Sequence, residues 1–304
     1  MNHHPQQYMI FANEIHQACK GAGTDELRIL NVMTQCSMED LQQVIRAYFV
    51  SFGQPISRLL KKETSGKFRD IIMGSFEGRY QYWARKIREA IKGVGTDEKA
   101  LIELVIMGNT DDWLSIREEY FKAYTRNVMD DISDDIAKNA EWAKLLRGWI
   151  FQMRYSRSQP ERDAEELYSA VKGAGTDADT FVRLLCSSTH EEFAQIARIY
   201  QEKYNKSLRQ TIIKEFSGKS EKAFLLAHDY MLSPAKGCCC IINDSIKGFG
   251  SRDKSLVDVT VLFRDRYSSE VPQAYEDFGN LAKDIKADCS GKYEKALLVL
   301  WKAQ

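Results

Sequence analysis

The sequence predicts an all-α protein built from four repeated units. The tetrad Gly-x-Gly-Thr, with a Lys in front, occurs in residues 20–24, 92–96 and 172–176, and an altered copy occupies residues 247–251. The second glycines of these copies stand at positions 23, 95, 175 and 250, which gives a period of roughly 70–80 residues. Apolar residues recur at helical spacing through long segments, and no run alternates in the way that a strand requires. A repeated loop on a repeated helical frame can present several equivalent ligand sites.

Within the first unit, local signals predict five helices in succession. The first helix precedes the glycine loop, and Thr24 is the expected N-cap of the second, with Asp25 complementing its positive end. The Ser-x-x-Asp sequence at residues 37–40 is typical of a capping box at the start of the third helix. Pro55 opens the fourth helix, and the Ser-Gly pair at residues 65–66 separates the fourth helix from the fifth.

The same order of signals recurs in the later units. Thr-x-x-Glu at residues 189–192 predicts another third helix, and Ser-Gly breaks recur at residues 217–218 and 290–291. The longest polar connection, residues 154–162, is the expected boundary between two halves of the chain. The four repeats are expected to span residues 8–78, 79–153, 160–233 and 234–304.

The composition excludes several classes of partner. Lys plus Arg and Asp plus Glu are balanced at 43 each, so the chain of 304 residues carries no net charge. That balance provides no long-range attraction to nucleic acid, and binding to an anionic surface would need positive charge from another source. No apolar stretch approaches the ~20 residues that span a bilayer, and the N-terminus has no signal-peptide pattern. The seven cysteines show no disulfide pattern, which favours a cytoplasmic location.

Each glycine loop is followed, about forty residues later, by an acid. These acids are Glu63, Asp135 and Glu215 in the first three units, and Asp288, slightly closer to its loop, in the fourth. A single Gly-x-Gly loop is typical of an ordinary helix–turn–helix connection. The recurring pair of loop and acid instead indicates a ligand site, because glycines let several carbonyl groups face one concavity. Carbonyl and carboxylate oxygens together form the kind of ligand set that Ca²⁺ takes.

The pairing of Lys-Gly-x-Gly-Thr-Asp with a later acid-x-Ser-Gly resembles the annexin family. The resemblance covers the chain from about Ile10 to Trp301, and the giardins of protists belong to the same superfamily. It implies four five-helix repeats packed into a slightly curved disc, with the glycine loops on its convex face. The second unit departs from the pattern, because Ile136-Ala137-Lys138 replaces the small-residue-Gly ending after its acid.

The resemblance also implies a ligand set for Ca²⁺ in each unit. The ligands are three backbone carbonyls, from the residue two before the first Gly and from both glycines, and the carboxylate of the distant acid. The residues concerned are Cys19, Gly21, Gly23 and Glu63; Ile91, Gly93, Gly95 and Asp135; Val171, Gly173, Gly175 and Glu215; and Ile246, Gly248, Gly250 and Asp288. In the fourth unit, Ser251-Arg252 replaces Thr-Asp and puts a cation beside the site.

The function that the resemblance implies is reversible, calcium-dependent binding to acidic phospholipid membranes by a cytoplasmic protein. A giardin-like cytoskeletal or scaffold role, with cytoskeletal or self-association partners, is the alternative. An enzyme is disfavoured, because the five histidines form no metal or nucleophile motif. The acid pairs at residues 130–131 and 134–135 are interpreted as solvated charge on a polar helix face.

Three further groups of residues are assigned by type. The tryptophans at positions 83, 113, 142, 149 and 301 are predicted to lie in the core. The run Cys238-Cys239-Cys240 is interpreted as small buried residues of a helix, since no other metal ligand lies nearby in the sequence. Val94 and Phe249, at the tips of two glycine loops, are candidates for insertion into a lipid interface.

Overall fold

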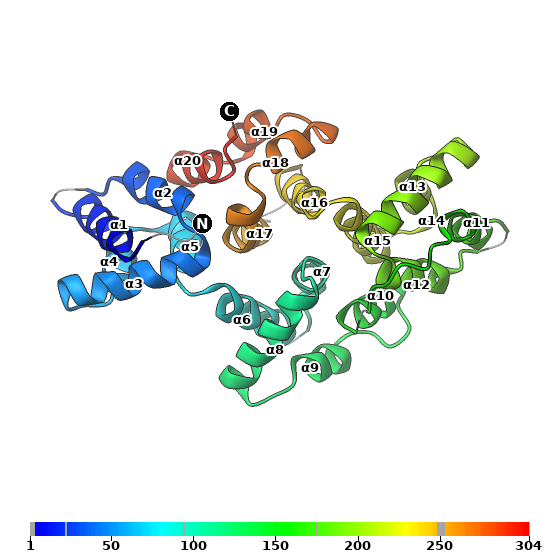
Figure 1. Cartoon of the computed structure of the whole chain (residues 1–304), viewed down its shortest axis with the longest axis horizontal. Coiled ribbons are helices and arrows are strands. Elements are labelled where there is room, and N and C mark those ends of the chain that lie inside the picture. Colours follow the sequence, from blue (N-terminus) through cyan, green and yellow to red (C-terminus); the bar gives the residue numbers. More distant parts are fainter. Residues whose placement is uncertain are drawn as a thin grey trace. The chain divides into compact units, whose positions relative to one another are not determined.

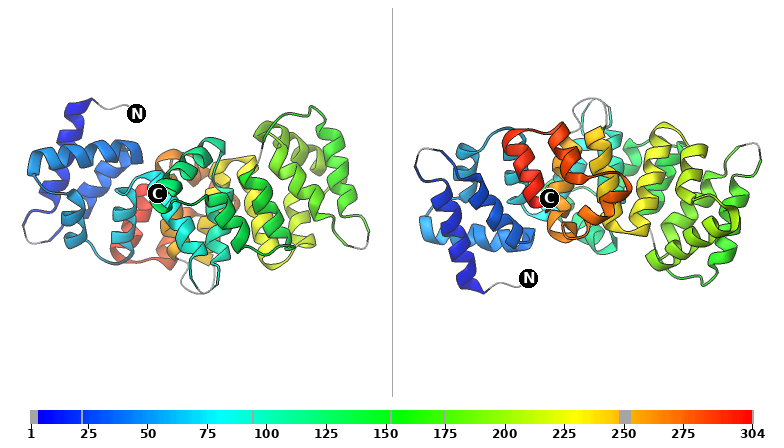
Figure 2. Two further views of the ribbon diagram at one scale, coloured as in Figure 1. Left: turned by 90° about the horizontal axis from the view of Figure 1, so that it is seen from below. Right: turned by 90° about the horizontal axis from the view of Figure 1, so that it is seen from above.

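The computed structural model describes residues 4–21, 23–93, 95–151, 153–173, 175–247 and 253–303. These residues form twenty α-helices and one short 3-10 helix, with no strand among them (Figure 1), so the all-α prediction is confirmed. The further views in Figure 2 show the same helices joined by loops. None of the described helices combines the length and the apolar character that crossing a bilayer requires.

Five helices follow one another in each of the first three repeats, as predicted. Repeat 1 contains α1 (Pro5–Ala18), α2 (Glu26–Gln35), α3 (Met38–Phe52), α4 (Ile56–Glu63) and α5 (Gly66–Ser75). Repeat 2 contains α6 (Arg79–Ile91), α7 (Glu98–Ile106), α8 (Thr110–Tyr124), α9 (Val128–Asp135) and α10 (Glu141–Ile150). Repeat 3 contains α11 (Pro160–Ala170), α12 (Ala178–Ser187), α13 (His190–Tyr204), α14 (Leu208–Glu215) and α15 (Gly218–Leu232).

Repeat 4 differs in its third helix. Its elements are α16 (Pro234–Lys247), α17 (Asp253–Tyr267), α18 (Val271–Ala274), the 3-10 helix η1 (Tyr275–Asp277), α19 (Leu281–Asp288) and α20 (Gly291–Leu300). The third helices α3, α8 and α13 have 15 residues each, whereas α18 has 4. In repeat 4 the second helix, α17, has 15 residues instead. Its last residues therefore occupy the part of the repeat where the third helix begins in repeats 1 to 3. This rearrangement accounts for the shorter spacing between the fourth glycine loop and Asp288.

Helix ends follow the local signals of the sequence. Ser37 and Asp40 form a reciprocal capping box, in which each side chain binds the backbone N–H of the other residue. Pro55 is the N-cap of α4, and Thr189 caps α13 by accepting a hydrogen bond from the Glu192 backbone. Each of these caps depends on residues close together in the sequence. The sequence therefore predicts the helix ends well.

The helices group into two compact units, one built mostly from repeats 1 and 4 and the other mostly from repeats 2 and 3. One unit comprises residues 1–82 and 241–304, and the other comprises residues 83–240. In the first unit α2 packs against α20 and α5 against α17, which joins repeat 1 to repeat 4. In the second unit α7 packs against α15 and α10 against α12, which joins repeat 2 to repeat 3.

The predicted boundary between two halves of the chain is therefore wrong, because residues 154–162 join α10 to α11 inside the second unit. This connection is polar in sequence, but it is held within the second unit by two arginines. Arg154 donates to the carbonyls of Leu185 and Ser188 at 2.7 and 3.0 Å. Arg157 binds the buried carboxylate of Asp163 at 2.8 Å. The hydrogen bonds of Arg154 reach residues more than thirty positions later in the sequence, so the polarity of the connection was a poor guide to its surroundings.

Within each unit, paired repeats are also joined by ion pairs close to the glycine loops. In every case a lysine near the start of a fifth helix binds an acid at the start of the other repeat's second helix. The pairs are Lys67–Asp253, Lys292–Glu26, Lys144–Asp179 and Lys219–Glu98. The lysine side chains are 42–57% exposed, so each pair contributes at most ~1 kcal/mol.

The core contains the aromatic residues that the sequence assigned to it. The tryptophans are all buried: Trp83, Trp113, Trp142, Trp149 and Trp301. Trp83 and Trp301 also satisfy their indole N–H groups, the first on the Leu104 carbonyl at 3.0 Å and the second on Thr260 at 2.9 Å. Cys238 and Cys239 are buried in α16, and Cys240 is half-buried, in agreement with their interpretation as packing residues.

One predicted surface acid lies in the interior instead. Asp131 is buried and accepts hydrogen bonds from Arg126, Tyr120 and Arg88, the last two at 2.7 and 2.9 Å. The hydrogen bond from Arg126 is the main reason that the pKa of Asp131 lies below its ordinary value, against the opposing effect of burial. The interpretation of this acid as solvated charge is wrong, because the cations that accompany it come from α6 and from the turn before α9.

Candidate functional site

The first three glycine loops are closed at their base in the same way. The backbone N–H of Asp25 donates to the carbonyl of Ala18 at 2.8 Å. The corresponding bonds, from Asp97 to Ala90 and from Asp177 to Ala170, have the same length of 2.8 Å. Each loop therefore leaves the first helix of its repeat and enters the second helix with the same backbone closure.

The glycines of these loops are required by backbone conformation. Gly21 and Gly23 have φ angles of 106° and 97°, in a region that other residues rarely adopt, and no atom lies within 4 Å of a Cβ built at either position. The same holds for Gly93, Gly95, Gly173 and Gly175. All six glycines are exposed, so the outer side of each loop is open to a ligand.

A threonine in each loop binds the distant acid of the same repeat. Thr24 donates from its hydroxyl to the Glu63 carboxylate at 3.2 Å, with the Glu63 carbonyl at 3.1 Å. Thr96 donates to the Asp135 carboxylate at 2.6 Å, and Thr176 donates to the Glu215 carboxylate at 3.0 Å. The structure thus brings loop and acid together in repeats 1, 2 and 3, across about forty residues of sequence.

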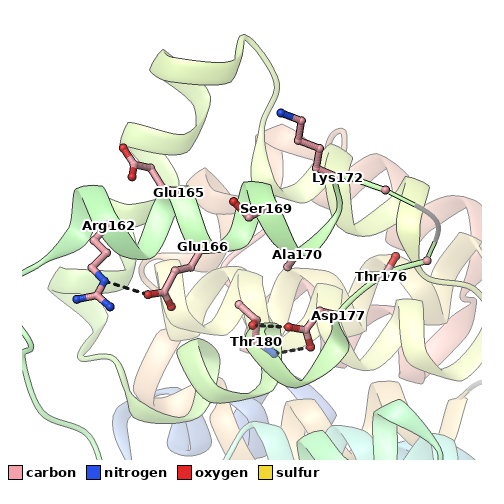
Figure 3. A pocket seen from close by; sticks show the side chains of 11 residues that line it. Arg162, Glu165, Glu166, Ser169, Ala170, Lys172, Thr176, Asp177 and Thr180 are labelled. Carbon is pink, nitrogen blue, oxygen red and sulfur yellow. Dashed lines mark hydrogen bonds and ion pairs between the residues drawn. The ribbon is translucent and has the colours of Figure 1, made fainter.

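This arrangement corrects the predicted role of the threonines. The N-cap of the second helix is the following aspartate, because Asp25 accepts from the Arg28 backbone at 3.0 Å and Asp97 accepts from the Ala100 backbone at 3.1 Å. In repeat 3, Figure 3 shows Asp177 lying against Thr180 at the start of α12. Asp caps a helix at least as well as Thr does, which frees the threonine hydroxyl for the acid.

The acids of repeats 1 and 3 have similar surroundings. The Glu63 and Glu215 side chains are 17% and 16% exposed, and the ammonium of the preceding lysine lies nearby. Lys62 Nζ is 3.5 Å from Glu63 Oε1, and Lys214 Nζ is 3.2 Å from Glu215 Oε1. Burial raises the pKa of Glu215, but hydrogen bonds from Thr176 and Lys214 outweigh burial and lower it overall. The Glu215 carboxylate is consequently ionised at neutral pH.

In repeats 2 and 4 the acids are shorter and more exposed. Asp135 and Asp288 are both exposed, at the last residues of α9 and α19. The residue before Asp135 is another acid, Asp134, and the residue before Asp288 is Ala287. Neither repeat therefore has a lysine directly before its acid.

The turn after each acid is made in two ways. In repeats 1, 3 and 4 a glycine with positive φ begins the fifth helix: Gly66 at 58°, Gly218 at 58° and Gly291 at 63°. In repeat 2, where that glycine is missing, the guanidinium of Arg147 supports a longer turn. Its nitrogens donate to the carbonyls of Ser133, Ile136, Ala137 and Lys138 at 3.1–3.2 Å. This role of Arg147 was not predicted, because the residue lies more than a helix turn inside α10 and no sequence motif links it to the turn.

The carbonyl residues that precede each loop lie at the end of the first helix. Cys19 and Val171 are the C-caps of α1 and α11, and Ile91 is the last residue of α6. Burial, together with the negative charge of Glu63, raises the pKa of the Cys19 thiol to about 11. This thiol stays protonated at neutral pH, so only the Cys19 carbonyl is suited to a hard cation.

The fourth loop is only partly described. Ile246 is buried near the end of α16, and Asp288 ends α19, but Gly248 and Gly250 lie outside the described residues. Ser251 and Arg252 also lie outside them, as do the two candidates for lipid insertion, Val94 and Phe249.

Beside the loop of repeat 3 lies a pocket of about 800 Å³ between α11 and α12 (Figure 3). Its acids are already paired, since Glu166 binds Arg162 at 3.2 Å and also Arg183, and Glu165 binds Lys203. Lys172 extends away from Asp177 and Thr180 in the same view. The pocket thus adds no uncommitted carboxylate to the loop.

The donor sets of repeats 1 to 3 fit Ca²⁺. Each combines the backbone carbonyls of two exposed glycines with one carboxylate that accepts a hydrogen bond from the loop threonine, and all these donors are oxygens. Among the described residues, no group of three or more His, Cys, Asp or Glu side chains is placed so that it could hold a metal ion. An ion in these repeats would therefore be held largely by backbone oxygen, by Gly21, Gly23 and Glu63 in repeat 1 and by the equivalent residues in repeats 2 and 3.

Comparison with known proteins agrees with this architecture. A family model described as Annexin matches residues 10–74, 82–141 and 162–227, well over half of the chain and all within repeats 1 to 3. Bovine annexin A4 is 31% identical over 295 residues, which cover 95% of this chain and 92% of that protein. Giardin subunit alpha-5 of Giardia intestinalis is 25% identical over 281 residues, covering 91% and 92%.

The fold is shared with a solved giardin as well. The calcium-bound structure of alpha-14 giardin superposes with a TM-score of 0.89 at 25% identity, covering 97% of this chain and 99% of that one. Bovine annexin A4 and this giardin structure match 95% and 97% of the chain, and the family model matches repeats 1 to 3. The chain therefore belongs to the annexin family.

Proposed function

We propose that this protein binds acidic phospholipid membranes reversibly and only when Ca²⁺ is present. The observation that carries the proposal is the threonine hydrogen bond that holds an acid against an exposed glycine loop in three repeats. Membership of the annexin family supports the same function. The protein would then be cytoplasmic and peripheral on membranes, with Ca²⁺ as its cofactor.

The charges of the chain explain why the protein would bind the membrane only in the presence of Ca²⁺. Each loop offers one carboxylate, and the protein has no net charge of its own. When bound, Ca²⁺ supplies excess positive charge and free coordination positions for a lipid phosphate. Several loops engaging one membrane act together, because every contact after the first is intramolecular. Weak individual loops can therefore give strong overall binding.

A co-sedimentation assay tests the proposal directly. We expect the protein to pellet with phosphatidylserine-containing vesicles in Ca²⁺ and to be released by a chelator. Vesicles of phosphatidylcholine alone serve as the control for surface charge. Sedimentation that does not change when the chelator is added would refute calcium-dependent binding.

The four repeats should fill in a definite order. Glu63 and Glu215 are half-buried and reach further than aspartate, whereas Asp135 and Asp288 are exposed. Arg252, close to the fourth loop in sequence, would oppose a nearby cation. We expect Ca²⁺ first in repeats 1 and 3, then in repeat 2, and weakly or not at all in repeat 4. Metal occupancies refined from crystals soaked at increasing Ca²⁺ check the order, and occupancy confined to repeat 4 would overturn it.

A second candidate function is a cytoskeletal or scaffold role. The observation in favour of this second function is the similarity to giardin subunit alpha-5 over most of both chains. In that case assembly with itself or with a filament would persist in chelator. The vesicle assay, run beside a filament co-sedimentation assay, separates the two functions by their dependence on Ca²⁺.

A further inference from the structure

The carboxylates of repeats 1 and 3 each divide their two oxygens between the loop and a lysine. In repeat 1, Glu63 Oε2 accepts from Thr24 at 3.2 Å, while Oε1 lies 3.5 Å from Lys62 Nζ. In repeat 3, Glu215 Oε2 accepts from Thr176 at 3.0 Å, while Oε1 lies 3.2 Å from Lys214 Nζ. Two loops far apart in sequence thus share one arrangement.

We propose that Lys62 and Lys214 occupy the carboxylates in the free protein and bind lipid phosphate once Ca²⁺ has displaced them. This inference rests on the proposed function and adds to it two lipid-binding residues. A cation bound by Glu63 or Glu215 repels an ammonium within ~4–6 Å, so the lysine must leave the carboxylate. Since Lys62 and Lys214 are 81% and 73% exposed, their side chains are not restrained by packing.

The released lysines stay beside the ion. Lys62 directly precedes Glu63 at the end of α4, and Lys214 directly precedes Glu215 at the end of α14. A phosphate that reaches the loop comes within reach of the neighbouring ammonium. A lysine near an acidic membrane surface strengthens binding about five-fold. Ca²⁺ would therefore convert two lysines that compete with it into two that assist the membrane contact.

Repeats 2 and 4 provide an internal contrast. The residue before the acid is Asp134 in repeat 2 and Ala287 in repeat 4, so neither offers an ammonium at this position. The lysine arrangement is consequently confined to the two repeats whose acids are glutamates. In repeats 1 and 3, therefore, this lysine would add a charge-dependent contact with the membrane.

Replacing Lys62 is expected to strengthen Ca²⁺ binding in solution but to weaken binding to the membrane. Lys62→Gln removes the competing cation, so Ca²⁺ binding without lipid, measured by equilibrium dialysis, should tighten by about two- to five-fold. At saturating Ca²⁺, binding of the same variant to phosphatidylserine vesicles should weaken about five-fold, and the Lys62→Gln/Lys214→Gln double variant should weaken about twenty-five-fold. A general effect of surface charge would tighten Ca²⁺ binding to the same extent when a neighbouring lysine is replaced.

Lys61→Gln is the matched control. Lys61 is an exposed neighbour on α4 that makes no ion pair among the described residues. Its replacement should therefore leave the Ca²⁺ dissociation constant measured by dialysis unchanged. The proposal would be overturned if Lys62→Gln had the same Ca²⁺ dissociation constant as Lys61→Gln. It would also be overturned if Lys62→Gln bound phosphatidylserine vesicles as strongly as the wild type. Failure of the wild-type protein to sediment with phosphatidylserine vesicles in Ca²⁺ would instead refute the proposed function itself, so the two failures are distinguishable.

Discussion

Replacing Glu63 and Glu215 together by Gln is expected to raise the Ca²⁺ concentration for half-maximal vesicle binding by roughly ten- to a hundred-fold, because a charged partner contributes about 1.5–3 kcal/mol. Among the described residues, each glutamate is the only carboxylate that its loop threonine binds. Gln keeps the size of the side chain and an oxygen for Thr24 or Thr176, but it carries no negative charge. Vesicle co-sedimentation across a Ca²⁺ series measures the shift.

The matched control for this pair is Glu118→Gln. Glu118 is an exposed acid on α8 that binds Lys122 at 2.7 Å and lies outside every glycine loop and acid turn. It should leave the Ca²⁺ dependence unchanged. The Glu63→Gln/Glu215→Gln variant should keep the thermal midpoint and helical signal of the wild type. If it loses either one, the glutamates are structural residues and the assignment to ligand binding is wrong.

Much of the fold could be predicted because its signals are local. A capping box such as Ser37–Asp40, or a glycine with positive φ such as Gly66, involves only nearby residues. The grouping of repeat 1 with repeat 4 could not be predicted, because it depends on helices such as α5 and α17 that meet only in the folded chain. The shortened third helix of repeat 4 left only a slight trace in the sequence, the smaller spacing before Asp288.

The candidate site shows the same division. The spacing of glycine loop and acid predicted which segments would meet, since it recurs in several repeats. Which atoms meet was not predictable: the threonines bind the acids, and the aspartates cap the helices. Arg147 and the cations around Asp131 were missed because each acts on residues of another element. Side-chain partners that are distant in sequence leave no periodic or local pattern.

A buried ion pair within the first compact unit, between Asp265 of repeat 4 and Arg79 at the start of repeat 2, carries the other large expected effect. Asp265 of α17 is 6% exposed at its side chain, and its Oδ2 accepts from Arg79 at 2.6 Å and from the Met38 backbone at 2.9 Å. Arg264, the next residue, is also buried and donates to the Met33 carbonyl at 2.6 Å. Asp265 thus links the start of α3, the start of α6 and α17 within one unit.

Asp265→Ala is expected to lower the free energy of unfolding by about 3–5 kcal/mol, because it leaves a buried cation without its counter-ion. Arg79 would keep Glu39, but that side chain is 61% exposed and so compensates only in part. Urea unfolding measures the loss, with Glu39→Ala as the control, which should cost only about 1 kcal/mol. Equal losses in the two variants would contradict the assignment of stability to the buried pair.

The pH dependence of stability gives this prediction a second test. Burial raises the pKa of Asp265, but the charges of Arg79 and Arg264 outweigh burial and lower it overall. A carboxyl whose pKa is lowered by folding stabilises the protein above its unfolded pKa, and this contribution is lost as the pH falls through the folded value. The wild type should therefore lose stability in acid more steeply than Asp265→Ala. Parallel acid profiles of the two proteins would show that Asp265 is not ionised in the folded state, and the expected loss at neutral pH would then have another cause.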